Sequence, residues 1–133
     1  MGDVVTMAAA DGDVQASARV RRWQAAWESL DPDQVLALYR ADATHASGAV
    51  RSIMPGRTDG MLRGLPEISA YARGVCQRVQ SLDFALTRVT EIGTRSFVEY
   101  RRTMNGDADK QVGVLEVLDW DGDKLAAVRV YHF

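Results

Sequence analysis

The C-terminal third of the chain constrains the fold most. Three segments there alternate in the manner of β-strands: SFVEYRRTM, QVGVLEVLDW and KLAAVRVYHF. Asn105-Gly106 and Asp121-Gly122, dipeptides that favour tight hairpin turns, separate them. Strands joined by short turns pair with their neighbours in sequence. Residues 96–133 are therefore predicted to form a three-stranded antiparallel meander.

Helical spacing dominates the first forty residues. A first helix is expected to begin near Asp13 as its N-cap, because apolar residues then recur every three or four positions. These residues are Ala16, Val20, Trp23, Trp27 and Leu30. Asp31 and Pro32 predict a tight corner into a second helix, since aspartate caps helices and proline suits their first turn. The second helix is expected to end at Asp42, before a short strand over residues 43–47.

The segment 48–64 is rich in glycine and is expected to be a loop or a loose hairpin. Two interpretations of its apolar side chains, Met54 and Met61 among them, remain open: a lid over a site, or a seal on the end of the core. Pro66 marks the start of a third helix, and residues 82–92 alternate as a further strand. Helices first and strands last predict an α+β domain.

The overall composition limits the classes of partner. The 133 residues carry a net charge of −2, with 16 basic residues spread along the chain, so we expect no nucleic-acid binding. No stretch approaches the ~20 apolar residues of a membrane span, and no spacing suggests a metal site. A single cysteine is typical of a cytoplasmic protein. Residues 1–12 are expected to be a disordered tail, and residues 13–133 a single domain.

Four short motifs follow one another along the chain: the Asp31-Pro32 corner, Tyr-x-x-Asp-Ala at 39–43, Gly-x-x-x-Ile at 64–68 and Gly-x-Lys-Leu at 122–125. Together they resemble the SnoaL-like branch of the nuclear transport factor two-like superfamily, from about residue 14 onward. The resemblance implies a cone-shaped, curved antiparallel sheet wrapped around three helices, the cystatin-like cone, with a pocket at its open end. It also implies a homodimer packed through the outer face of the sheet.

The resemblance also allows catalytic positions to be compared. Ketosteroid isomerases place a tyrosine, an aspartate base and an aspartic acid where this sequence has Trp23, Ser47 and Glu116. A serine cannot replace the base, so that activity is not expected. Limonene epoxide hydrolases use an arginine and an aspartate two residues apart, which Glu99 and Arg101 echo in reverse order. Their second carboxylate, expected near Val130, is missing.

The candidate catalytic residues are Glu116, His45, Arg101 and Glu99. Glu116 has apolar neighbours on its face, so it is either a desolvated functional group or half of a structural ion pair. Hydrophobicity favours turning Glu99 and Arg101 outward, whereas the resemblance turns them inward, and both orientations remain open. Either a proton-transfer role or a satisfied core position suits His45.

The remaining predicted pocket-lining residues come from every part of the chain. They are Trp23, Trp27, Ser47, Met54, Met61, Tyr71, Val128, Val130 and His132. His132 is equally compatible with the pocket rim and with simple exposure.

Two functions are compatible with these residues. The first is an isomerase, dehydratase or cyclase that acts without a cofactor or metal, by acid-base chemistry on a small apolar carbonyl compound. The second is a non-catalytic ligand-binding or dimerisation domain of the same fold. In either case we expect a small apolar molecule in the cone and a homodimer through the outer sheet face. The dimer is expected because the last two strands are apolar on both faces.

Overall fold

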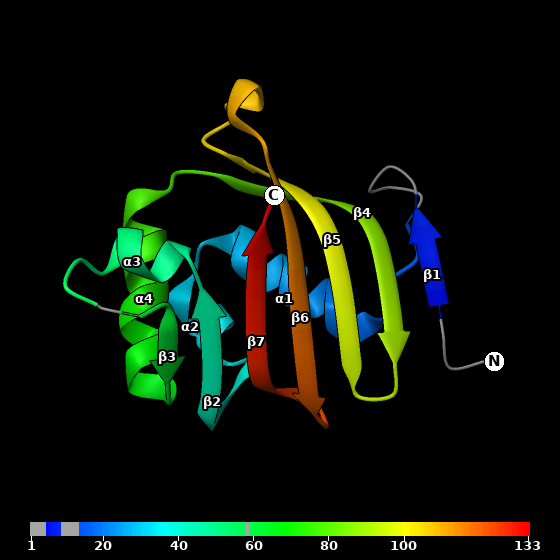
Figure 1. Ribbon diagram of the computed structural model, residues 1–133, viewed down its shortest axis with the longest axis horizontal. Helices are drawn as coiled ribbons and strands as arrows, with labels where there is room; N and C mark the ends of the chain where they lie inside the picture. The colour runs from blue at the N-terminus through cyan, green and yellow to red at the C-terminus, as the bar shows by residue number, and fades with distance from the viewer. Residues whose placement is uncertain (1–4, 9–13, 58) are drawn as a thin grey trace.

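The computed structural model describes residues 5–8, 14–57 and 59–133, and in this part of the chain seven strands form one curved sheet (Figure 1). The strands are β1 (Val5–Ala8), β2 (Tyr39–Ser47), β3 (Met61–Arg63), β4 (Leu82–Ile92), β5 (Arg95–Met104), β6 (Val112–Asp121) and β7 (Lys124–His132). Their order in the sheet is β1-β4-β5-β6-β7-β2-β3. The predicted α+β cone is confirmed.

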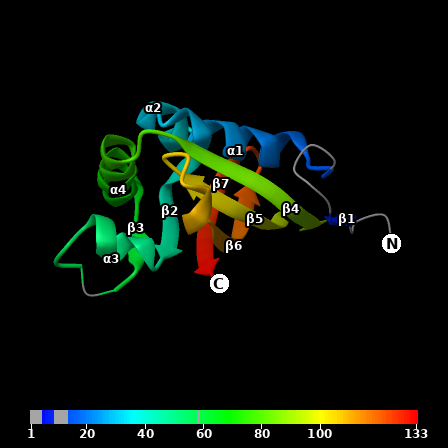
Figure 2. The same cartoon turned by 90° about the horizontal axis from the view of Figure 1, so that it is seen from above.

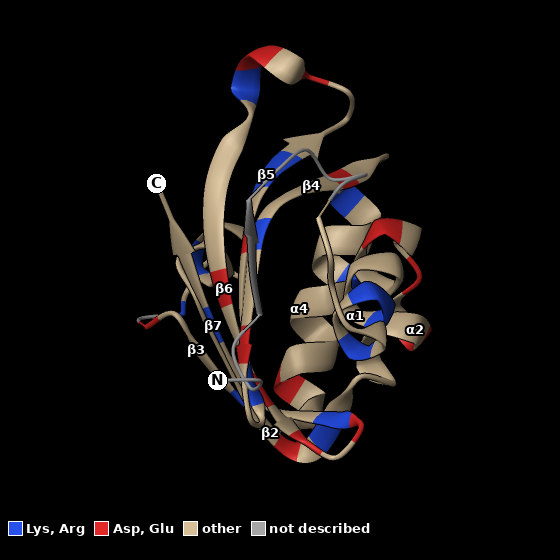
Figure 3. Cartoon of the chain, turned by 90° about the vertical axis from the view of Figure 1, so that its right-hand side faces the viewer, with Lys and Arg blue, Asp and Glu red and all other residues tan. Residues whose placement is uncertain are grey.

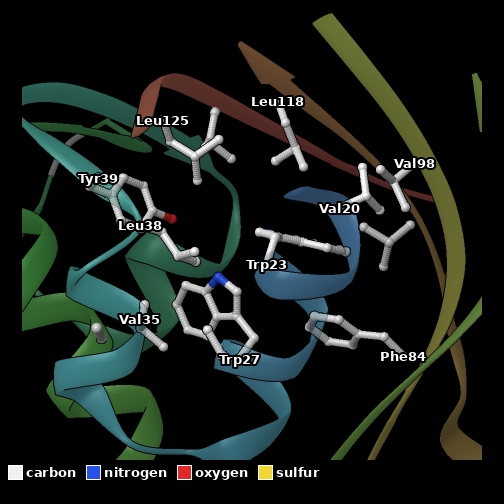
Figure 4. Close-up of a cluster of buried hydrophobic side chains, with 14 of the residues drawn as sticks. Val20, Trp23, Trp27, Val35, Leu38, Tyr39, Phe84, Val98, Leu118 and Leu125 are labelled. Atoms are coloured by element: carbon white, nitrogen blue, oxygen red, sulfur yellow. The ribbon is translucent and has the colours of Figure 1, made fainter. Parts of the chain in front are cut away.

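The described residues form the helices α1 (Ala18–Ser29), α2 (Pro32–Leu36), α3 (Ala49–Ile53) and α4 (Leu65–Arg78). Of these, α1, α2 and α4 lie against one face of the sheet, and β4 and β5 curve over them, whereas α3 lies beside β3 and contacts α4 (Figures 2 and 3). The core lies between the two layers. In Figure 4, Trp23 and Trp27 of α1 point from the helix layer toward apolar side chains of the sheet. No helix within the described residues is both long and apolar enough to cross a membrane.

The first helix begins later than the sequence predicts. Asp13, the expected N-cap, lies outside the described residues, and Ser17 caps α1 by accepting from the backbone N–H of Val20. At the corner, Asp31 caps α2 as predicted, accepting from the backbone N–H of Asp33 at 2.9 Å. The start of each helix thus follows the local capping chemistry.

The strand β2 is four residues longer than predicted and begins at Tyr39, so α2 does not extend to Asp42. It pairs in parallel with β7, whereas every other strand pair in the described sheet is antiparallel. The pairing register shifts between Tyr39 and Thr44, which marks a β-bulge. Beyond the bulge, the buried side chains of β2 are Ala43, His45 and Ser47.

The glycine-rich segment is more ordered than a loop, because it contains α3 and the short strand β3, which pairs with β2. Arg57 connects it to α4: its guanidinium donates to the backbone oxygen of Met61 at 2.6 Å and to the carboxylate of Glu67 at 3.0 Å. This segment therefore packs against α4.

The chain from β4 to β7 forms the meander that the sequence predicts, with a 3₁₀ turn, Ala108–Lys110, between β5 and β6. β1 pairs antiparallel with β4 and forms the edge of the sheet opposite β3. The predicted disordered tail is therefore corrected for residues 5–8, which form an edge strand. The rest of that segment lies outside the described residues.

Candidate functional site

A cavity of about 240 Å³ opens between α1, α3, α4 and the inner face of the sheet. Its floor consists of buried residues and its rim of exposed ones, Ser52, Met104 and His132. The apolar walls of the cavity come from residues of α4 and of β4, including Phe84. The residues that surround the cavity are Trp27, His45, Ser47, Ala49, Ser52, Ile53, Tyr71, Val75, Val79, Leu82, Phe84, Tyr100, Arg102, Met104, Glu116, Val130 and His132.

Glu116 is the one acidic residue among those that line the cavity, and its side chain is only 4% exposed. The phenol of Tyr100 donates to its Oε1 at 2.7 Å, and the indole N–H of Trp23 donates to its Oε2 at 3.3 Å. Burial raises the pKa of Glu116 to about 7, and these two donors oppose that rise without cancelling it. A carboxyl group in this state is divided between its acid and its base forms near neutral pH.

His45 is buried on the inner face of β2, where its Nδ1 shares a hydrogen bond of 3.1 Å with the phenol oxygen of Tyr39. Desolvation lowers the pKa of His45 to about 4, so the imidazole is neutral at pH 7. Burial also raises the pKa of Tyr39 well above its ordinary value. Its phenol therefore keeps its proton.

The side chains of β5 point to the faces that its hydrophobic pattern predicts. Val98, Tyr100 and Arg102 point inward, which places Glu99 and Arg101 on the outer face. The carboxylate of Glu99 lies 3.9 Å from the guanidinium of Arg88. The guanidinium of Arg101 donates to Gln111 at 3.3 Å. The inward alternative for this pair is thus wrong, because alternation along the strand fixes the face of each side chain.

Most of the other predicted lining residues do reach the cavity: Trp27, Ser47, Tyr71, Val130 and His132. His132 lies at the rim, so the choice between rim and simple exposure is resolved. Four predicted residues lie elsewhere. Trp23 is fully buried behind Glu116, Val128 is in the core, and Met54 packs against the core. Met61 lines a separate surface depression with Arg51 and Arg129.

Two polar residues that line the cavity, Tyr100 and Arg102, and Tyr39, the partner of His45, are not among the candidates that the sequence predicts. Helical spacing predicts that Tyr39 belongs to the second helix, so the sequence does not indicate its approach to His45. Tyr100 and Arg102 belong to the face that hydrophobicity favoured burying. That same alternation is the signal that could have identified them, because Arg102 follows Val98 and Tyr100 at even spacing on the buried face.

The described residues contain no group of three or more His, Cys, Asp or Glu side chains that could hold a metal ion. The polar groups around the cavity are instead a carboxyl, two imidazoles, a guanidinium, an indole N–H and hydroxyls. These groups can transfer protons and donate hydrogen bonds.

Solved structures with the same fold come from several bacteria. A SnoaL-like protein of unknown function from Burkholderia thailandensis is 23% identical, with a TM-score of 0.72 over 85% of this chain and 89% of that one. A protein with a ketosteroid isomerase-like fold from Catenulispora acidiphila, in complex with trimethylamine, is 19% identical, with a TM-score of 0.69 over 88% of this chain and 86% of that one. A candidate polyketide cyclase from Sinorhizobium meliloti is 12% identical, with a TM-score of 0.67 over 87% of this chain and 95% of that one.

No curated protein matches the chain. The model of the SnoaL-like domain matches residues 20–128, a span that covers α1 to most of β7 and includes both Glu116 and His45. This chain therefore belongs to the SnoaL-like domain family.

Proposed function

We propose that the protein is a cofactor-free acid-base enzyme that moves a proton on a small carbonyl compound bound in the cavity. The observation that carries this proposal is Glu116, a carboxyl group that faces an apolar cavity and has a pKa of about 7. General acid-base catalysis is most efficient when the pKa of the catalytic group lies near the working pH. Perturbed groups in concave sites are frequent at catalytic centres.

Glu116 retains capacity to act on a substrate although both of its oxygens accept hydrogen bonds. Each carboxylate oxygen carries two lone pairs, and Tyr100 and Trp23 occupy one on each oxygen. In the proposed step, Glu116 takes a proton from the carbon next to the substrate carbonyl, and that C–H electron pair becomes the enolate. Return of the proton to the same or to another carbon completes an exchange or an isomerisation, with no change in oxidation state.

His45 is proposed to stabilise the enolate oxygen as a neutral hydrogen-bond donor. In this proposal the phenol of Tyr39, which burial keeps protonated, donates to Nδ1 of His45. The ring proton of His45 then resides on Nε2, which has no hydrogen-bond partner among the described residues, in a side chain that lines the cavity.

Proton exchange in D2O tests this function directly. The protein is incubated with a panel of small aryl ketones, and loss of the α-proton signal is followed by NMR. We expect exchange above the buffer rate for the wild type, and a loss of about a hundredfold or more in Glu116→Gln, a range typical of general acid-base groups. Glu99→Gln is the matched control, because Glu99 lies on the outer face. Equal exchange rates in the wild type and Glu116→Gln would exclude Glu116 as the base.

A second function, ligand binding without turnover, is supported by the same two hydrogen bonds to Glu116. A carboxyl group held by Tyr100 and Trp23 is also a satisfied buried polar group, which needs no catalytic role. Under this alternative, ketones bind to the cavity and perturb its NMR signals but exchange no protons faster than in buffer.

We also propose that the protein is a cytoplasmic homodimer. Phe97, Leu115 and Tyr131 lie close together on the outer face of β5, β6 and β7, and none of them is buried. The side chain of Tyr131 is 48% exposed. A second copy packed on this face would cover these apolar groups. The single cysteine of the sequence fits a reducing compartment.

A further inference from the structure

Three buried nitrogen atoms beside the cavity have no hydrogen-bond partner among the described residues. They are Nε1 of Trp27, Nε2 of His45 and Nε of Arg102. Buried polar atoms in proteins are nearly always paired, and each one left unpaired destabilises the fold. Because all three side chains line the same cavity, a molecule bound there can supply the missing partners.

Arg102 is the most informative of the three, because it is a permanent cation in a half-buried position. Within the described part of the chain it makes no ion pair, and Glu116 acts on it only through longer-range electrostatics. The effect of Arg102 on the pKa of Glu116 is the weakest of the four that shift this pKa. A partly desolvated guanidinium without an anion is unfavourable. An anion bound in the cavity would therefore stabilise this guanidinium.

Nε1 of Trp27 and Nε2 of His45 indicate that the same molecule carries a second hydrogen-bonding group. Indole and guanidinium nitrogens only donate hydrogen bonds, and the tautomer proposed above makes Nε2 of His45 a donor too. All three missing partners are therefore acceptors. Between these donors the walls are apolar, formed by Val75, Val79, Leu82 and Phe84.

We propose that the ligand of this cavity is a small apolar carboxylate that also carries a carbonyl oxygen, an oxo acid in chemical class. The carboxylate pairs with Arg102 near the rim, where the planar fork of the guanidinium matches it. The carbonyl oxygen accepts from His45 and Trp27 at the floor. This inference rests on the proposed function of the cavity as a small-molecule site and defines the substrate class.

A matched pair of probes tests the charge requirement. 3-Benzoylpropionate carries both groups, and 4-hydroxy-1-phenylbutan-1-one keeps the aryl ketone but replaces the carboxylate with a hydroxymethyl group. Titration calorimetry at pH 7.5 is expected to show the acid binding roughly ten- to hundredfold tighter than the alcohol, the range of a charge-assisted hydrogen bond. The Nε–H resonance of Arg102 is expected to shift on adding the acid and not on adding the alcohol.

Two neighbouring arginines provide the control. Arg102→Gln should remove the preference for the acid, and Arg102→Lys, which keeps the charge but loses the fork, should retain part of it. Arg101→Gln should bind both probes as the wild type does, because Arg101 lies on the outer face. Thermal melting checks that each variant is folded.

The possible outcomes separate this inference from the proposed function. If the alcohol binds as tightly as the acid, or if Arg101→Gln and Arg102→Gln lose the acid equally, the carboxylate proposal is wrong, whereas small-molecule binding stands. If neither probe binds to the folded wild type, both the carboxylate proposal and the small-molecule role are overturned.

Discussion

The phenol of Tyr100 donates a 2.7 Å hydrogen bond to the carboxyl group of Glu116, and both side chains are almost completely buried beside the cavity. Among the described residues Glu116 is thus not half of an ion pair, the structural alternative that the sequence left open, and neither Arg101 nor His45 is its hydrogen-bond partner. A phenol and an indole hold the carboxyl group instead, and neither carries a charge that would neutralise it. This explains why the pKa of Glu116 stays raised.

The first prediction concerns this hydrogen bond. Tyr100→Phe removes a donor that favours the ionised form, so we expect the pKa of Glu116 to rise further above about 7. NMR titration of the carboxyl carbon of Glu116 measures the change. Tyr131→Phe is the control, because Tyr131 lies half exposed on the outer face. An unchanged titration in Tyr100→Phe would show that the phenol does not stabilise the carboxylate.

The second prediction concerns stability against pH, because Glu116 and His45 act in opposite directions. The pKa of Glu116 is raised from 4.5 to about 7, so the folded state retains a proton that the unfolded state loses, and stability falls as pH rises through this interval. The pKa of His45 is lowered from 6.5 to about 4, so its contribution to stability rises with pH between these values. Between pH 4.5 and 6.5 the two contributions nearly cancel.

Substitution of either residue should reveal the pH-dependent contribution of the other to stability. The free energy of unfolding of Glu116→Gln, relative to wild type, is expected to rise by about 3 kcal/mol from pH 4.5 to 7.5. The free energy of unfolding of His45→Asn, relative to wild type, is expected to fall by about 3 kcal/mol from pH 4 to 6.5. Urea unfolding at a series of pH values measures both. Profiles of both variants that run parallel to the wild type would contradict the opposing pKa shifts.

The third prediction concerns two glycines in the surface depression that Met61 lines. A Cβ atom on Gly60 would lie 2.7 Å from the backbone oxygen of Ser47, whereas one on Gly48 would meet nothing within 4 Å. Gly60→Ala should therefore destabilise the fold by about 1–3 kcal/mol, the usual cost of overpacking. It should also disturb the hydrogen bond from the backbone N–H of Ser47 to the oxygen of Gly60.

Gly48→Ala is the matched control, because the φ of −61° at Gly48 suits any residue. Thermal melting compares the two variants. Equal stability of both would mean that β3 can shift away from β2 at no cost.

The fourth prediction concerns the proposed dimer. Light scattering should give twice the protomer mass at micromolar concentration, and Leu115→Lys should give the protomer mass, because it places a charge among the apolar residues of the outer face. Far-UV circular dichroism checks that the variant is folded. A wild-type mass equal to one protomer would exclude the dimer.

How much the sequence predicts differs between the two halves of the fold. The bounds of β4, Leu82 and Ile92, match the prediction, because apolar residues alternate from Leu82 to Leu86 and Gly93, with its positive φ, turns the chain after Ile92. At Leu38 and Tyr39, by contrast, tertiary pairing overrides helical spacing. The backbone N–H of Leu125 donates to the oxygen of Leu38 at 2.6 Å, and Tyr39 pairs with Leu125. Nothing near Tyr39 in the sequence encodes a partner more than eighty residues away.

The contact between Tyr39 and His45 illustrates why part of the site was unpredictable. Six residues along a regular strand span about 20 Å, yet the Tyr39 phenol oxygen and Nδ1 of His45 are 3.1 Å apart. The bulge between Tyr39 and Thr44 bends the strand and allows the long phenol to reach back. The position of Glu116, by contrast, followed from its apolar neighbours, because regular alternation continues through Val114 and Leu118.

The parallel pairing of β2 with β7 also has a consequence for the order of folding. β2 carries His45, yet one of its two neighbours in the sheet is the last strand of the chain. During synthesis, one edge of β2 stays without its partner until β7 has left the ribosome, and long-range pairings of this kind form slowly. Glu116 on β6 and His45 on β2 are therefore brought to the same cavity only when β7 inserts between their strands. Assembly of the site and closure of the sheet are thus the same late step.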